Sequence, residues 1–218
     1  MSGQALRKTE PLLEGAELHC GIGPNSYRVR IFMAEKGIDL PRVEVDIING
    51  EHRTPAFKSM NSLGQIPVLA LADGSVITES VAICRFLEEA VPHPRLFGSD
   101  AVSKGKVEMW NRRVEIEIFG TIGSVALHTD EMFKDRLTQF PAFAETQRDA
   151  VPGKWAWLDR EMADGRRFIA GDDFSVADIT AGVAAWLGDF FGMEIPGDLA
   201  NVRRWNDRVR ARPSWDAP

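Results

Sequence analysis

Hydrophobic and polar positions follow two different patterns along this chain, and the pattern changes near residue 92. Before that residue, short apolar runs alternate with stretches whose apolar residues recur every three or four positions, which predicts strands alternating with helices. The expected elements are strands at 18–20, 43–47, 68–71 and 76–77 and helices at 25–36, from 55 onward and at 79–90. The order βαβαββα predicts a mixed sheet covered by helices, an α/β domain.

Local signals support several of these boundaries. Gly37 follows the first helix and suits a left-handed C-terminal cap. Thr54 and Pro55 form an N-cap followed by a proline at the first helical position. Asp73-Gly74 separates two apolar runs and predicts a tight hairpin turn.

Beyond the Pro92-His93-Pro94 segment, which predicts a linker, only helical spacing is found. Long helices are expected at 103–128, 143–162, 176–190 and 199–210. Ser175 followed by Asp178 is a capping-box-like pattern, with Asp in place of the usual Glu or Gln. We therefore predict a disordered extension at 1–15, an α/β domain at 16–91, a linker at 92–100 and an all-helical domain at 101–218.

Composition narrows the possible functions of the 218 residues. The formal net charge of −6 argues against a broad nucleic-acid surface, and no apolar run is long enough to span a membrane. The two cysteines, Cys20 and Cys84, form no disulfide framework and no zinc-finger spacing, which favours a reducing cytoplasm and no metal. Cys20 is expected in a strand, as a buried structural thiol.

Three short segments carry candidate chemistry. Gly21 to Arg30 is a glycine-containing turn that opens a helix, where free N–H groups favour an anion, although a plain turn fits as well. Ile66-Pro67 precedes a strand; a cis bond would turn the Ile66 backbone outward to pair with a peptide-like ligand, and a trans proline is the alternative. Glu79-Ser80 begins the next helix, where Ser80 can bind a carboxylate and Glu79 an ammonium group. A plain helix cap is the alternative.

Together these segments resemble the thioredoxin-like domain of the cytosolic glutathione transferases. The resemblance rests on the segments at 26–38, 64–69 and 79–83 and covers roughly residues 17–213, with the segment at 174–179 matching the family's helix-capping motif. It implies that Ile66 pairs through its backbone with the cysteinyl part of glutathione and that Pro67 is the family's cis-proline. It also implies γ-glutamyl contacts by Glu79 and Ser80. Gln65, in the same segment as Ile66, is a further expected glutathione-binding residue.

The resemblance further places a polar side chain near the glycyl end of glutathione at His52, for which an exposed loop histidine is the alternative. It implies glutathione as co-substrate, a cytoplasmic homodimer and a role in detoxification. Because the family's second domain holds the other substrate, we expect Trp110, Asn111, Phe119 and Trp186 to line a pocket between the domains for an apolar electrophile. Aromatic residues at helical spacing are otherwise core residues.

The chain departs from the usual family pattern at the residue that activates the thiol. The serine of the serine-type classes aligns with Gly23, which has no hydroxyl, so Asn25 and Ser26 are the candidates nearby. Lowering the pKa of an ordinary thiol, about 8.5, by two units takes about 2.7 kcal/mol. A helix start supplies roughly 0.3–2 kcal/mol and a charged hydrogen bond about 1.5–3 kcal/mol, so main-chain amides can suffice.

The chain also resembles a fungal and bacterial subgroup that lacks the usual catalytic residue. This resemblance implies that the thiol is activated by the helix N-terminus and by a water that Ser and His of the second domain hold. Ser124 and His128 are the candidates, because they lie four positions apart on one helix face. A solvent-exposed helix end is the alternative for His128. The expected reaction is attack of the glutathione thiolate on an apolar electrophile, with isomerisation, dehalogenation or peroxide reduction on the same site as alternatives. A non-catalytic binding module is the rival from another class.

Overall fold

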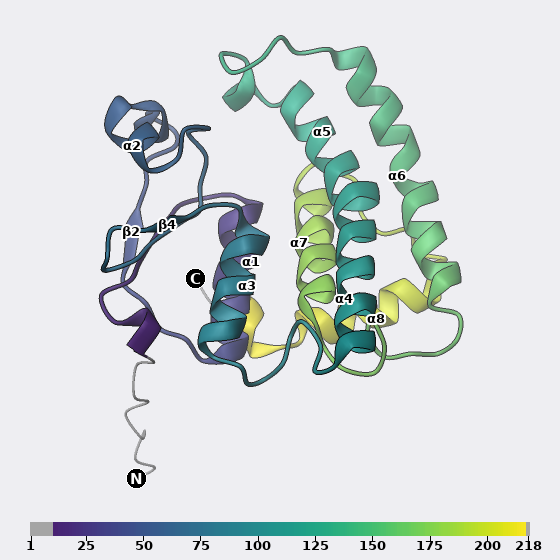
Figure 1. Cartoon of the computed structure of the whole chain (residues 1–218). Helices are drawn as coiled ribbons and strands as arrows, with labels where there is room; N and C mark the ends of the chain where they lie inside the picture. Colours follow the sequence, from purple (N-terminus) through teal and green to yellow (C-terminus); the bar gives the residue numbers. More distant parts are fainter. Residues whose placement is uncertain (1–10, 217–218) are drawn as a thin grey trace. The chain divides into compact units, whose positions relative to one another are not determined.

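The computed structural model describes residues 11–216, and the chain divides after Pro94 into two compact units, residues 1–94 and 95–218 (Figure 1). Most of the predicted disordered extension, residues 1–10, lies outside the described residues. Pro11–Leu13 forms a 3-10 turn, and the Leu13 side chain is buried. The described part of residues 11–15 therefore contributes one side chain to the core of the first unit.

The first unit is a thioredoxin-like α/β fold. Its strands are β1 (Glu17–Cys20), β2 (Arg42–Glu44), β3 (Val68–Ala70) and β4 (Val76–Ile77), and its α-helices are α1 (Pro24–Lys36), α2 (Pro55–Met60) and α3 (Ser80–Ala90). The sheet order is β2-β1-β3-β4, with β2 parallel to β1 and the other pairs antiparallel. The predicted βαβαββα order and mixed sheet are confirmed. A 3-10 turn at Glu51–Arg53 was not expected.

Helices α1 and α3 lie side by side in this unit (Figure 1). At the C-terminal end of α1, Gly37 adopts φ 63°, the left-handed cap expected from the sequence. The Lys36 ammonium is buried there, 2.7 Å from Glu88 Oε2 of α3, and it donates to the Pro94 carbonyl at 2.6 Å. A buried ion pair therefore joins the two helices at the end far from their N-termini.

As far as it is described, to residue 216, the second unit is all-helical apart from a short bridge between Phe168 and Gly171. Its α-helices are α4 (Ala101–Val114), α5 (Gly120–Thr129), α6 (Pro141–Glu161), α7 (Val176–Phe190) and α8 (Ala200–Arg210). A π-helical turn, Glu115–Phe119, joins α4 to α5 where the sequence predicted one continuous helix. None of the helices within residues 11–216 is both long enough and apolar enough to cross a bilayer.

Capping boxes close two of these helices at their N-termini. Asp100 accepts hydrogen bonds from the N–H groups of Val102 and Ser103 at the start of α4. At the start of α7, the Asp178 carboxylate accepts from four donors: the N–H and hydroxyl of Ser175, the Ile169 N–H and the indole N–H of Trp205. Burial raises the pKa of Asp178, although all four donors oppose that rise by favouring the carboxylate.

Candidate functional site

The first helix begins with unpaired main-chain donors. Gly23 is its N-cap, Pro24 occupies the first turn, and no side chain caps the helix. Among the described residues, the N–H groups of Asn25 and Ser26 have no acceptor, whereas the Tyr27 N–H already bonds the Gly23 carbonyl at 3.1 Å. The first turn also contains no acidic residue. This helix start therefore favours an anion from outside the chain.

The Ser26 side chain turns inward, away from a ligand role. It is 1% exposed, and its Oγ accepts a long hydrogen bond of 3.4 Å from the Gly21 N–H. Its hydroxyl therefore holds the turn that precedes α1, and only its main-chain N–H belongs to the open helix start. Asn25, in contrast, is exposed.

Gly23 shapes this turn through its backbone. Its φ of 130° lies in a region that L side chains rarely adopt, and a Cβ built there would meet nothing within 4 Å. The turn thus leaves open space at the position that aligns with the family's serine. A glycine suits this backbone conformation, which explains why no hydroxyl is offered from this position.

The loop before β3 presents the second group of predicted residues. The Ile66-Pro67 bond is cis, as expected, and His93-Pro94 is also cis, which the sequence did not predict. Among the described residues, neither the N–H nor the C=O of Ile66 has a hydrogen-bond partner. A Cβ built on Gly21 would lie 3.2 Å from Ile66 Cδ1, so this loop lies against the turn that opens α1.

Asn61 holds this loop in shape. Its side chain is 5% exposed, its Nδ2 donates to the Gln65 carbonyl at 2.8 Å, and its Oδ1 accepts from the Leu63 N–H at 3.1 Å. Gln65 itself has an exposed side chain. The sequence reasoning gave Asn61 no role; its position four residues before Gln65, in a polar loop, was the available signal.

His52 is buried, so the expected alternative of an exposed loop histidine is wrong. Its side chain is 3% exposed, and its Nε2 lies 3.3 Å from Nε of Arg53. A Cβ built on Gly64 would lie 2.8 Å from the His52 carbonyl oxygen, which places His52 beside the loop that carries Gln65. The 3-10 turn at Glu51–Arg53 draws the imidazole inward.

The third helix also begins without a side-chain cap or an acidic residue in its first turn. The N–H groups of Ser80, Val81 and Ala82 have no acceptor among the described residues. Glu79 precedes them with φ 64°, the one positive φ of a non-glycine residue within residues 11–216, and its side chain is exposed. Such a backbone conformation costs of the order of 1–3 kcal/mol and concentrates at functional sites.

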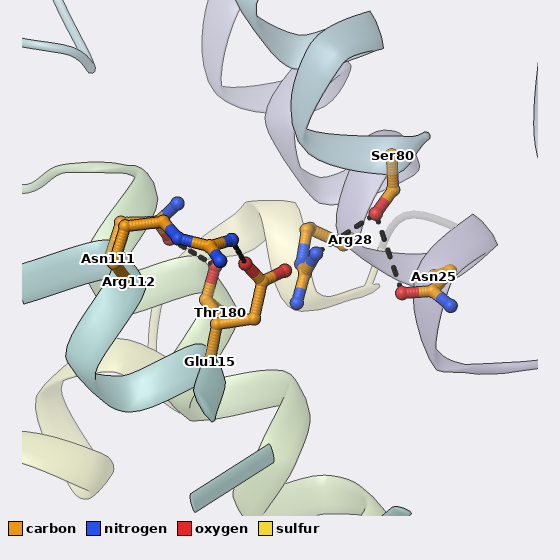
Figure 2. A network of polar contacts seen from close by, with 7 residues as sticks. All are labelled: Asn25, Arg28, Ser80, Asn111, Arg112, Glu115 and Thr180. Atoms are coloured by element: carbon orange, nitrogen blue, oxygen red, sulfur yellow. Dashed lines mark hydrogen bonds and ion pairs between the residues drawn. The ribbon is translucent and has the colours of Figure 1, made fainter. Parts of the chain in front are cut away.

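A chain of polar contacts connects the starts of α1 and α3 (Figure 2). The Arg28 guanidinium donates to Ser80 Oγ at 2.9 Å, and the Ser80 hydroxyl donates to Asn25 Oδ1 at 3.4 Å. Arg28 is 1% exposed and Ser80 is 6% exposed. The sequence reasoning missed Arg28, although Arg28 lies four residues before Phe32 and therefore shares the apolar face of its helix.

Neither cysteine belongs to this constellation. Cys20 and Cys84 are both free thiols with no exposed surface. Burial raises the pKa of Cys84 to about 12 and raises the pKa of Cys20, against the opposing charge of Arg30. Cys20 is thus the buried thiol that the sequence predicted. Within residues 11–216, no cluster of three His, Cys, Asp or Glu side chains has the geometry of a metal site.

In the second unit, Ser124 and His128 lie on α5, both half-buried. Ser124 Oγ donates to the Gly120 carbonyl at 2.8 Å, and His128 Nδ1 accepts from the Phe140 N–H at 3.2 Å. The His128 ring packs edge-on against Phe143, with centroids 5.2 Å apart. Because Nδ1 is an acceptor, a neutral His128 carries its proton on Nε2.

The four predicted acceptor residues of the second unit have different surroundings. Trp110 is 7% exposed and stacks with Trp157 at 6.0 Å, with the Arg166 guanidinium 4.7 Å from its ring. Asn111 is fully buried, and its Oδ1 accepts from the Thr180 hydroxyl at 2.6 Å (Figure 2). These two side chains therefore pack within the helical unit.

The other two predicted acceptor residues reach its surface. Phe119 lies half-buried in the π-helical turn, and Trp186 of α7 is 36% exposed. They are the accessible members of the predicted set.

Comparisons with known proteins point to one protein family. A family model described as the N-terminal domain of glutathione S-transferase matches residues 22–90, and one described as the C-terminal domain matches residues 131–208. The chain is 31% identical over 196 residues to glutathione S-transferase 2 of Saccharomyces cerevisiae, covering 88% of this chain and 84% of the relative.

Two further similarities extend over nearly the whole chain. Maleylacetoacetate isomerase of Pseudomonas aeruginosa is 40% identical over 198 residues, covering 88% of this chain and 89% of the isomerase. The crystal structure of a glutathione S-transferase domain-containing protein from Marinobacter aquaeolei superimposes with a TM-score of 0.86 at 35% identity. It covers 91% of this chain and 98% of that one.

Proposed function

Because the chain belongs to the glutathione S-transferase family and is a glutathione-dependent transferase, we propose that the first unit binds glutathione along the open starts of α1 and α3 and at Ile66. The enzyme then joins the glutathione sulfur to an apolar electrophile. The proposal concerns which residues do this work and on which substrate.

The observation that carries the proposal is the unpaired backbone of Ile66. Within residues 11–216 its N–H and C=O have no partners, and main-chain groups of this kind, here just before β3, are obligatory hydrogen-bonding groups. An extended peptide satisfies both at once by adding beside the strand. Glutathione offers that pairing through its cysteinyl residue, which places its sulfur beside the turn at Gly21 and Gly23.

The ends of glutathione then meet matching groups. The free N–H groups of Ser80 and Val81 receive the γ-glutamyl carboxylate, and the exposed Glu79 carboxylate receives its ammonium group. His52 and Gln65, on neighbouring loops, are our candidates for the glycyl end. Pro67 shapes the backbone that presents Ile66.

The thiol is activated by the main chain in this proposal. The N–H groups of Asn25 and Ser26 stabilise the thiolate in the open space at Gly23, where no hydroxyl competes. We also retain Ser124 and His128 as assisting residues of the second unit, acting through a water. The Nε2–H of a neutral His128 suits it to donate a hydrogen bond to such a water.

In the proposed reaction, the thiolate attacks an electrophilic carbon, so a C–S bond forms while the leaving group departs with the bonding pair. In an addition, the carbon instead takes up a proton. We propose an apolar electrophile that contacts Phe119 and Trp186, while Trp110 and Asn111 support the helices behind them. A cytoplasmic homodimer acting in detoxification completes the proposal.

The second candidate function is glutathione-dependent isomerisation. It is favoured by the 40% identity to a relative named maleylacetoacetate isomerase. In that case the sulfur adds to a double bond, the adduct rotates, and the same C–S bond breaks, so glutathione is regenerated. Dehalogenation and peroxide reduction remain alternatives on the same site.

Retention on glutathione resin, followed by assays with chlorodinitrobenzene and with maleylacetoacetate, tests these assignments. We expect retention, release by free glutathione, and conjugation that His128→Ala slows and Asp130→Ala, at the neighbouring helix end, does not. Isomerase activity without conjugation would favour the second candidate. Retention without turnover of either substrate would favour a non-catalytic binding module, and absence of retention would overturn the glutathione site.

A further inference from the structure

The polar contacts run from the buried Arg28 guanidinium to Ser80, at the start of α3, and on to Asn25, at the start of α1 (Figure 2). Arg28 lies one turn into α1 and is 1% exposed. Removing a guanidinium from water is costly unless it is hydrogen-bonded, so its contacts are specific features of this site. It donates at 2.9 Å to the hydroxyl of Ser80, the first residue of α3.

Hydrogen-bond directions follow from the donors available. Arginine only donates, so the bond from Arg28 occupies a lone pair of Ser80 Oγ. The single hydroxyl hydrogen of Ser80 is then left to donate, and Asn25 Oδ1 accepts it at 3.4 Å. The Ser80 hydroxyl is therefore engaged on both sides within the chain. What remains at the start of α3 for a ligand is the main-chain N–H of Ser80 and of Val81.

We propose that Arg28 is a positioning residue that, by holding the Ser80 hydroxyl, fixes the start of α3 relative to Asn25 at the start of α1. The inference rests on the proposed function, in which these two starts receive the carboxylate and the sulfur of one glutathione molecule. The two groups are separated by a fixed covalent path. The spacing of the helix starts therefore decides whether both are bound together.

The charge of Arg28 on α1 also acts on a side chain of α3. It lowers the pKa of Cys84 on α3, even though burial raises that pKa overall to about 12. Lys36 provides a matched comparison, because it is also a buried cation of α1 paired with α3, through Glu88 at 2.7 Å. Lys36 lies at the opposite ends of these helices, away from both open starts.

The test is a double-mutant cycle for glutathione affinity, measured by calorimetry on the full chain. Arg28→Met and Ser80→Ala should each weaken binding about tenfold, which is about 1.4 kcal/mol. The double variant should bind no more weakly than Ser80→Ala alone, because Arg28 acts through Ser80. In steady-state assays, the KM for glutathione should rise in Arg28→Met while kcat changes far less.

Controls separate positioning from folding. Lys36→Met should lower thermal stability and leave glutathione affinity unchanged, and Arg28→Lys should recover part of the lost affinity. If Arg28→Met does not fold, Arg28→Gln, which keeps an N–H donor, completes the cycle with Ser80→Ala. Should no Arg28 variant fold, Arg28 is a requirement of the fold and the positioning role is overturned.

Two failures remain distinguishable. Additive losses in Arg28→Met and Ser80→Ala, in a wild-type protein that binds glutathione, would overturn the role of Arg28 alone. A wild-type protein that does not bind glutathione would overturn the proposed site together with this inference.

Discussion

Two pairs of helices in this protein begin in opposite ways. In the helical unit, α4 and α7 begin at capping boxes. Asp100 accepts the N–H groups of Val102 and Ser103 in the first turn of α4, and Asp178 in the first turn of α7 accepts the N–H and hydroxyl of the N-cap residue Ser175. In the α/β unit, α1 and α3 begin with no side-chain cap and no acid in the first turn. The exposed end of a helix dipole can be neutralised from within the chain or by a ligand. At the two closed starts the chain supplies its own acceptor, whereas the two open starts are those that we propose to receive glutathione.

The largest expected effect is at the closed start of α7. Asp178→Ala leaves four donors without their acceptor inside the core, so we expect the free energy of unfolding to fall by about 3–5 kcal/mol. Urea unfolding followed by circular dichroism measures it. Asp173→Ala, at an exposed aspartate nearby, should change little. A loss for Asp178→Ala as small as that of the control would remove the contrast between the two kinds of helix start.

The next effect is at the open start of α3, and it should appear in binding. Glu79→Gln removes the exposed carboxylate proposed to hold the glutathione ammonium, at a cost of about 1.5–3 kcal/mol in affinity, or tenfold and more. The thermal midpoint should stay unchanged, because the side chain makes no cap. Calorimetry checks both, with Glu89→Gln at the exposed far end of α3 as control. Equal affinities for the two variants would contradict the assignment.

A third change tests whether the open start of α1 can be closed. Serine is a favoured N-cap residue, yet Gly23→Ser places a side chain at φ 130° and should lower stability by about 1–3 kcal/mol. Gly105→Ser, inside α4 at an ordinary backbone conformation with open space around it, should be neutral or slightly stabilising. Chemical denaturation compares them. A stabilised Gly23→Ser protein would show that this turn accepts a capping side chain.

The smallest effect concerns the exposed cap of α4 and depends on pH. The N–H of Ser103, with that of Val102, holds the pKa of Asp100 below its usual value of 3.8. A lowered folded-state pKa means that the stabilisation is present above pH 3.8 and is lost as the pH falls through the folded value. Thermal midpoints of the wild type and Asp100→Ala should therefore differ at pH 7, by less than for Asp178→Ala, and converge in acid. A gap that persists after the Asp100 carboxylate has been protonated in the folded state would point to a contribution other than its charge.

Local sequence signals were sufficient for most of the fold. The start of α7 at Val176 was predicted correctly, because Ser175 and Asp178 form a cap whose partners are only three positions apart. The hairpin turn at Asp73-Gly74 and the end of α1 at Gly37 were also predicted correctly from neighbouring residues alone. Strand β2 is shorter than predicted, ending at Glu44, because pairing to β1 extends no further.

The candidate site could be predicted from sequence only where it depends on the backbone. Ile66, Pro67, Glu79 and Ser80 could be selected as candidates from segment order, since their proposed roles need only a chain direction and a helix start. The burial of Arg28 and His52 depends on contacts between segments distant along the chain. Arg28 reaches Ser80 across 52 positions, a pairing that periodicity cannot reveal.

The π-helical turn at Glu115–Phe119 has a consequence for how this family member can diverge. A π turn holds one residue more than an α turn, and each residue rotates a helix by about 100°. The residues of α5, including Ser124 and His128, therefore face about a quarter turn away from the direction that an unbroken helix would give them. Deleting one residue from this turn would rotate the face of α5 by about 100° without changing any side chain on it. Evolution can therefore change the direction of these side chains without substituting them.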